Sequence, residues 1–292
     1  DPNGTRHATA SLDICRASSA LGRSRPAAAP TRVPRGPGRV TSGRMTELTA
    51  IYRHPVKALG AEALRQVALR AGETLPGDRV WALAHEKTDY DWAAPGWASC
   101  SVFLRGAYAP TLMAVTADGA PGGPITFRHP ERPDLTVDPG SSEGEAAFVA
   151  WADALVAPGR PRPARLPPAI GRAMTDHPAP LISVLSDASR RALGQHAGRE
   201  LDRRRFRGNL WIDGLPPWGE FDLMSREIAV GAARLRVVER IERCSAPHAD
   251  PQTGRRDLDM LALLERIGGH RDFGVLAEVI DGGEVAVGDA VQ

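Results

Sequence analysis

The sequence predicts a mainly β protein, a β-rich α+β fold with two β-barrel-like domains and a few short helices. After Met45 the chain alternates short apolar runs with turns rich in Gly, Pro and Asp, the spacing typical of barrels and sandwiches. A proline-rich seam, Ala157 to Pro168, then interrupts regular structure. With 292 residues, of which 42% are apolar, the chain is long enough for two moderate domains. We expect a disordered extension over 1–44 and domains over 45–160 and 165–292.

The expected strands follow one another along both halves of the chain. They cover residues 48–52, 67–69, 80–84, 111–115, 135–137, 210–212, 228–230, 235–241, 275–280 and 285–287. The sequence Asp281-Gly282-Gly283-Glu284 predicts a hairpin between two of them. Helices are expected from a Ser186 cap to about Gly198, from about Asp257 to Gly268, and over 145–156.

Charge is concentrated at the beginning of the chain. Residues 1–44 hold eight arginines and two aspartates, so the remainder is mildly acidic although the whole chain carries +2. A nucleic-acid-binding protein would show a basic face on its folded part, so we expect no nucleic-acid partner. The segment has the arginines of an organellar presequence, but its Pro and Gly content opposes an amphipathic helix, and Met45 is a plausible start.

Hydropathy and cysteine usage indicate a cytoplasmic protein. No apolar run approaches the ~18 residues that a membrane span needs, and no secretory signal is visible. Cys15, Cys100 and Cys244 are odd in number and far apart, which argues against a disulfide framework. The histidines lack metal-ligand spacing, which argues against zinc.

Cys244 is the first candidate for chemistry. It follows Arg243 directly, and a cysteine beside a cation suits a thiolate that binds a soft metal or attacks an electrophile. Taken alone, however, a cysteine is more often a small buried hydrophobe. His248, four residues further on, is a candidate proton donor.

A second group of candidates could hold an anion. Its cations are Lys57, Arg79, Arg207 and Arg243, and Asn209 could contact the edges of a ring. Each cation alone could equally be a surface ion-pair partner or a solvated side chain, and Asn209 could cap a turn. Together the set suits the phosphate and the ring amides of a pterin.

These motifs resemble the MOSC family, named after the C-terminal domain of molybdenum cofactor sulfurase, with its accompanying N-terminal barrel domain. The resemblance rests on residues 54–57 (His-Pro-Val-Lys), 77–79 (Gly-Asp-Arg), 206–209 (Phe-Arg-Gly-Asn), 243–244 (Arg-Cys), 250–254 (Asp-Pro-Gln-Thr-Gly) and 287–289 (Val-Gly-Asp). The motifs occur in the family's order between Met45 and Gln292. The sequence is similar to the amidoxime reducing component group.

The resemblance implies that Cys244 ligates molybdenum in a molybdenum cofactor (Mo-molybdopterin). It also implies that Lys57, Arg79, Arg207, Asn209 and Arg243 hold the pterin and its phosphate. The implied activity is an oxidoreductase that reduces small N-hydroxylated or N-oxide compounds. A separate electron donor, a cytochrome or an iron-sulfur protein, would be needed because no ferredoxin-type cysteine cluster follows Asp289.

Another class of function stays open at this point. The chain could be a non-catalytic carrier that delivers molybdenum cofactor, or sulfur held on Cys244, to other enzymes. We do not expect pyridoxal phosphate as a cofactor, because neither Lys57 nor Lys87 lies in an obvious Schiff-base setting.

Overall fold

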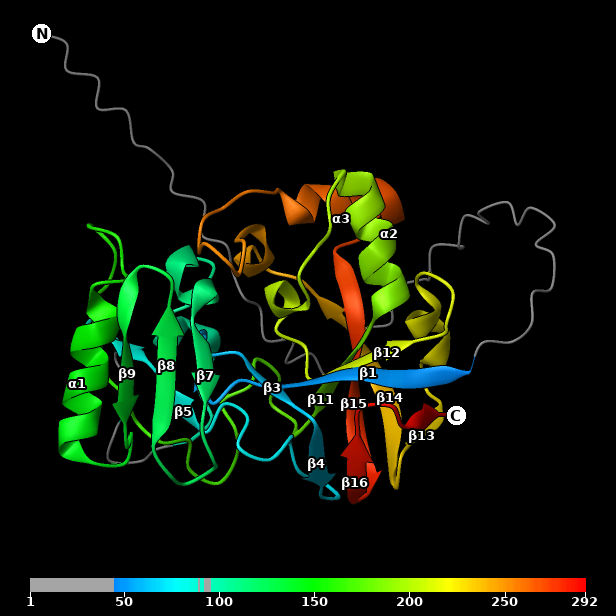
Figure 1. Ribbon diagram of the computed structural model, residues 1–292, viewed down its shortest axis with the longest axis horizontal. Coiled ribbons are helices and arrows are strands. Elements are labelled where there is room, and N and C mark those ends of the chain that lie inside the picture. Colours follow the sequence, from blue (N-terminus) through cyan, green and yellow to red (C-terminus); the bar gives the residue numbers. More distant parts are fainter. Residues whose placement is uncertain (1–44, 89, 92–95) are drawn as a thin grey trace, which may run out of the picture.

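The computed structural model describes residues 45–88, 90, 91 and 96–292, so the extension expected over 1–44 lies outside the described residues. Within these residues the chain forms seventeen strands and three α-helices (Figure 1). The prediction of a mainly β fold is therefore confirmed.

The largest sheet combines strands from both ends of the chain. In spatial order its strands are β12 (Leu210–Asp213), β11 (Ile182–Ser186), β15 (Asp272–Asp281), β14 (Ala233–Glu242), β13 (Glu227–Val230), β17 (Ala290–Val291), β1 (Thr46–Arg53) and β3 (Glu62–Leu64). β1 pairs with β17 within this order and also with β12 at its other end, so β1 hydrogen-bonds to strands from both ends of the sheet. In Figure 1 the blue β1 lies across the orange and red strands of the C-terminal half. The first of the described strands is thus part of the C-terminal core.

Two helices cover one face of this sheet. α2 (Asp187–Ala197) begins at the Ser186 cap, whose side chain accepts from the Ser189 N–H, and ends at Gly198 in the left-handed conformation. This helix connects β11 to β12, which are parallel and so need such a crossover. α3 (Met260–Gly268) begins three residues later than expected, because Asp259 is the residue that caps it. The helix expected at Ser186 is confirmed.

The N-terminal half forms smaller, separate sheets. β7 (Thr116–Asp118), β8 (Ile125–His129) and β9 (Arg132–Val137) form one sheet, and α1 (Ser142–Asp153) packs against it. Three two-stranded pairs complete the set: β2 (Val56–Lys57) with β5 (Trp81–Ala82), β6 (Ala84–His85) with β10 (Pro163–Arg165), and β4 (Gln66–Leu69) with β16 (Gly283–Ala286). Two barrel-like domains are accordingly not confirmed.

Two local predictions were wrong. Residues 111–115 were expected to form a strand, but Pro110–Ala114 form a 3₁₀ helix, η2. The hairpin expected around Gly282 and Gly283 does not form, because β16 pairs with β4 rather than with β15. A Cβ on Gly282 would lie 2.7 Å from the Leu69 carbonyl oxygen, so this glycine permits a close approach of two chain segments. The glycine pair had a packing role that sequence alone did not distinguish from a turn.

The proline-rich seam contributes to the N-terminal half. β10 lies within it and pairs only with the two-residue strand β6, an edge position that tolerates proline. Beyond the seam, the Ala169 and Met174 N–H groups donate to the carbonyls of Val80 and Arg79. The seam therefore brings residues 174–177 to the turn that carries Arg79.

Candidate functional site

Three of the predicted cations come together from three separate segments. Lys57 ends the short strand β2, Arg79 lies in the following turn, and Arg207 ends the 3₁₀ helix η3 (Arg203–Phe206). Nη2 of Arg79 donates to the main-chain oxygen of Arg207 at 3.0 Å, and Nη2 of Arg207 donates to the carbonyl of Val56 at 3.2 Å. We call Lys57, Arg79 and Arg207 the cation cluster.

The backbone conformation at Arg79 and Arg207 determines the direction of these two side chains. Arg79 and Arg207 both adopt the left-handed conformation, with φ of 50° and 49°. Non-glycine residues rarely adopt this region, and such residues tend to occur at functional sites. The Arg79 N–H donates to the His54 carbonyl at 2.6 Å, which fixes its turn against the end of β1.

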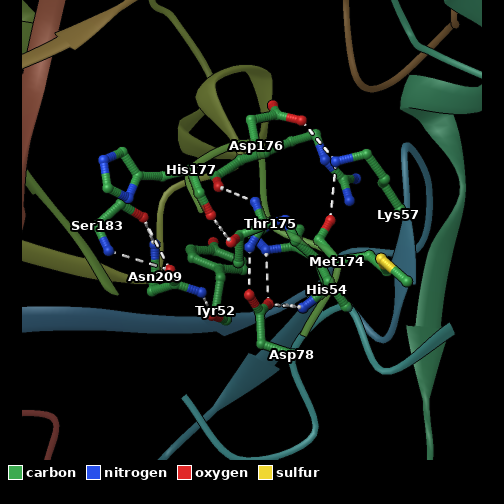
Figure 2. Close-up of polar contacts among 12 residues, drawn as sticks. Tyr52, His54, Lys57, Asp78, Met174, Thr175, Asp176, His177, Ser183 and Asn209 are labelled. Atoms are coloured by element: carbon green, nitrogen blue, oxygen red, sulfur yellow. Dashed lines mark hydrogen bonds and ion pairs between the residues drawn. The ribbon is translucent and has the colours of Figure 1, made fainter. Parts of the chain in front are cut away.

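A buried His54–Asp78 pair lies beneath the cluster. Asp78 accepts from the His54 main-chain N–H at 2.7 Å (Figure 2). Asp78 also forms an ion pair with Arg79. Burial would raise the pKa of Asp78, but Arg79 and His54 outweigh it and hold that pKa below its usual range. Burial and the nearby Arg207 lower the pKa of His54 to about 3, so the imidazole is neutral at physiological pH.

Asp176 supplies a carboxylate on the open side of the cluster. Its Oδ1 accepts from Lys57 Nζ at 2.6 Å, and the same ammonium donates to the Met174 carbonyl at 2.8 Å (Figure 2). Lys57 is buried, whereas the Asp176 side chain is 75% exposed. The charge of Lys57 lowers the pKa of Asp176 to about 2, and Arg79 and Arg207 act in the same direction. Solvent therefore reaches the cluster from the side of Asp176.

The positive charge of the cation cluster is only partly neutralised by the carboxylates around it. Burial, together with the positive charge of Arg79, lowers the pKa of Arg207 to about 9. Desolvation and the like charge of a neighbouring cation both disfavour a charged guanidinium. An anion placed here would relieve both effects, so the arrangement suits a phosphate group.

Cys244 follows the end of β14 and carries a free, exposed thiol. Desolvation by the surrounding protein raises the pKa of this thiol, and the Asp176 carboxylate adds to the rise. Arg243 and the Ala246 N–H lower the pKa, but not enough to reverse the direction. The expectation that Arg243 makes Cys244 a thiolate is therefore wrong for the protein without a bound cation, where the neutral thiol is favoured.

Arg243 and Asn209 are both engaged within the protein. Nε of Arg243 donates to the Phe273 carbonyl at 2.8 Å, and Nη1 donates to the Phe206 carbonyl at 2.9 Å. The Asn209 side chain accepts from the Ser183 hydroxyl at 2.8 Å and donates to the Tyr52 carbonyl at 3.2 Å (Figure 2). These bonds hold together the strands and loops that present Arg207 and Cys244, and a contact with a cofactor stays a prediction for both residues.

His248 faces helix α3 instead of the cation cluster. It lies in the 3₁₀ helix η5 (Ala246–His248), and its Nε2 accepts from the Leu261 N–H at 3.4 Å. Burial lowers the pKa of His248, although Asp259 opposes this. With Ser245 it lines a cavity of about 510 Å³. Its role as a proton donor stays a prediction.

Sequence reasoning did not single out Asp176, Asp78 or His54 as site residues. His54 and Asp78 belong to the quoted motifs, but nothing in those motifs indicates that the two side chains are buried against each other. Asp176 has no local signal, because only the fold brings it to Lys57, 119 residues away in sequence.

The described part of the chain contains no helix that is both long and apolar enough to cross a membrane.

Comparisons with known proteins address the C-terminal half most directly. Two solved structures are similar at low identity: the YUAD protein from Bacillus subtilis (TM-score 0.43, 13% identity, 85% of this chain and 94% of that one) and YiiM from Geobacillus stearothermophilus (TM-score 0.32, 19% identity, 44% and 65%). Comparison with curated proteins found no match. Residues 173–292, which include Asp176, Arg207 and Cys244, match the MOSC domain, a family associated with molybdenum cofactor binding.

Proposed function

We propose that the protein binds a molybdenum cofactor, with the cation cluster on the phosphate and Cys244 as the protein ligand of the metal. One observation carries this proposal. Lys57, Arg79 and Arg207 come from distant segments to one place, where Arg79 donates to the Arg207 carbonyl and Lys57 donates to Asp176, the carboxylate that also raises the pKa of Cys244. The MOSC match over residues 173–292 supports the same cofactor class.

The donor set fits such a group. A phosphate would form charge-assisted hydrogen bonds with the guanidinium groups of Arg79 and Arg207 and with the Lys57 ammonium. A cysteine sulfur is the soft ligand that suits a second- or third-row metal, and the exposed Cys244 thiol is open to one. Metal binding would remove the thiol proton, because a bound cation favours the thiolate.

The activity we propose is reduction of an N-hydroxylated or N-oxide compound. Bound molybdenum would supply two-electron oxygen-atom chemistry. The overall reaction takes two electrons and two protons and releases the substrate oxygen as water, so a separate electron donor, a cytochrome or an iron-sulfur protein, is required. Arg243 holds the segment that carries Cys244 in place, through its bonds to the carbonyls of Phe206 and Phe273.

His248 is the residue we propose to supply a proton. Its lowered pKa keeps the imidazole mostly neutral at pH 7, so it would deliver a proton only after taking one from solvent. The cavity that it lines gives solvent that access.

A carrier function is the second candidate, and the state of Cys244 favours it. The thiol is exposed, so a partner protein could reach it. An exposed cysteine could hold a persulfide or a transient metal contact and release it to a partner protein. On this proposal the cation cluster still binds the cofactor phosphate, but the protein alone has no turnover.

The test is metal and pterin analysis of protein expressed in a host that makes the cofactor. We expect molybdenum and pterin to copurify in near-equal amounts with the wild type and to be lost in Arg207→Ala. Arg128→Ala is the matched control, because Arg128 is an exposed arginine of β8 that pairs with Asp134. Turnover of benzamidoxime with an artificial electron donor then separates enzyme from carrier. Absence of cofactor from the wild type would refute both candidates.

A further inference from the structure

A cavity of about 510 Å³ opens between the N-terminal half and α3. Ser245, the residue next to Cys244, lines it, and so do Tyr108 and Arg160 from the N-terminal half. The two halves are also in direct contact here, because Arg256 donates to the Ala107 carbonyl. The cavity is therefore built by both halves and lies within one residue of the proposed metal ligand.

The acidic side chains of the cavity are already engaged. Asp259 caps α3 by accepting from the Ala262 N–H at 3.0 Å, and it lies 3.4 Å from His248 Nε2. Glu265 forms an ion pair with Arg271 at 3.1 Å. These contacts leave little acidic charge for the other arginines of the cavity.

Two arginines remain without a carboxylate. Within the residues that the structure describes, neither Arg160 nor Arg256 forms an ion pair, and both are exposed. Arg256 also lowers the pKa of His248, which lines the same cavity. The uncommitted charge of the cavity is positive, which favours an anionic ligand.

An aromatic ring stands beside these cations. Among the residues that the structure describes, Tyr108 is one of five large hydrophobic side chains that are exposed, at 37%. The guanidinium carbon of Arg105 lies 4.2 Å from its ring centroid, and that of Arg160 lies 5.9 Å away. The longer contact leaves the Arg160 guanidinium able to turn toward a ligand, and a planar ligand could stack on either group.

We propose that this cavity selects small aromatic substrates that carry an acidic group, with the acid between Arg160 and Arg256 and the ring against Tyr108. The inference rests on the proposed function for the reaction itself, but the binding of the acid does not depend on molybdenum. A substrate held in this way would share the cavity with Ser245, the residue that follows the proposed metal ligand Cys244.

The kinetic test compares benzamidoxime with 4-carboxybenzamidoxime on the cofactor-loaded protein. We expect the carboxylated compound to have the higher kcat/KM, and Arg160→Gln to lower that preference about tenfold, the usual effect of losing one charge-assisted hydrogen bond. Arg128→Gln is the matched control and should keep the preference. Equal kcat/KM for the two compounds in the wild type would overturn the proposal while leaving the molybdenum chemistry intact.

A binding test separates this proposal from the proposed function. Benzoate is titrated into protein prepared without cofactor, and binding is followed by calorimetry. We expect one saturable site that Arg160→Gln and Arg256→Gln each weaken about tenfold and that Arg128→Gln leaves unchanged. If benzoate binds in this way but no molybdenum is ever found, the cavity assignment survives and the proposed function fails. Failure of benzoate to bind, or binding unaffected by either variant, would overturn the cavity assignment.

Discussion

Asp176→Asn is the substitution that tests the electrostatics of the site most directly. The carboxylate raises the pKa of Cys244 and at the same time pairs with Lys57 at 2.6 Å. Removing its charge should therefore lower the pKa of Cys244 and leave the cation cluster without its exposed anion. The thiolate fraction and the affinity for an added anion should both increase.

The expected magnitudes are modest, because Asp176 is 75% exposed and solvent screens its charge. A small fall in the pKa of Cys244 would raise the thiolate fraction at pH 7 by a small factor. The free energy of unfolding should change by about 1 kcal/mol, because solvent screens the carboxylate of this ion pair although the ammonium of Lys57 is buried. Lys57 keeps its bond to the Met174 carbonyl in the variant.

The assay is the pH dependence of Cys244 alkylation by iodoacetamide, quantified by mass spectrometry of the peptide that contains it. Phosphate binding to the same variant is measured by calorimetry. Asp134→Asn is the control, since Asp134 is an exposed aspartate that pairs with Arg128 away from the site. An alkylation profile that is unchanged or displaced to higher pH in Asp176→Asn would refute the assignment of this carboxylate to the Cys244 environment.

Three further predictions follow from the same geometry. Cys244→Ser should abolish reduction of N-hydroxylated compounds with the fold retained, and a serine variant that is fully loaded yet equally active would exclude Cys244 as the metal ligand. Gly208→Ala should lower the free energy of unfolding by about 1–3 kcal/mol, because its Cβ would lie 2.3 Å from Leu185 Cδ1; denaturant unfolding checks this, and an unchanged midpoint would contradict it. Acidification should destabilise the protein through His54, whose folded pKa is about 3 against 6.5 unfolded, so its contribution is complete above pH 6.5 and is lost as the pH falls toward 3. Urea unfolding from pH 7 to 5 measures this slope, which should be shallower in His54→Gln; an equal slope in the two proteins would show that His54 is not responsible.

The elements that the sequence predicted well have local causes. The Ser186 cap and the Gly198 end of α2 act within one turn of the helix, so the sequence around them is sufficient. β11 was not expected, although it lies directly before this cap. Its apolar run is too short for periodicity to distinguish a strand from other buried structure.

The incorrect hairpin shows what local patterns leave undetermined. Gly282 and Gly283 have the composition of a tight turn, but β16 takes β4 as its partner, a strand more than two hundred residues earlier in the chain. That choice depends on the packing of Leu69 and Val285 into the large core. For the same reason Asp176 could not be assigned to the site from sequence, because its contact with Lys57 exists only in the folded chain.

The Phe206–Asn209 motif shows how few residues of a recognisable pattern need to face a ligand. Phe206 stacks on Phe273 with ring centroids 4.1 Å apart, Gly208 permits close contact with Leu185, and Asn209 bonds to Ser183. These three residues position the backbone, and Arg207 alone reaches the cation cluster. Because Arg207 ends η3 in the left-handed conformation, its direction depends on the anchors on both sides. The motif therefore specifies a loop that positions the Arg207 guanidinium, and Phe206, Gly208 and Asn209 anchor that loop.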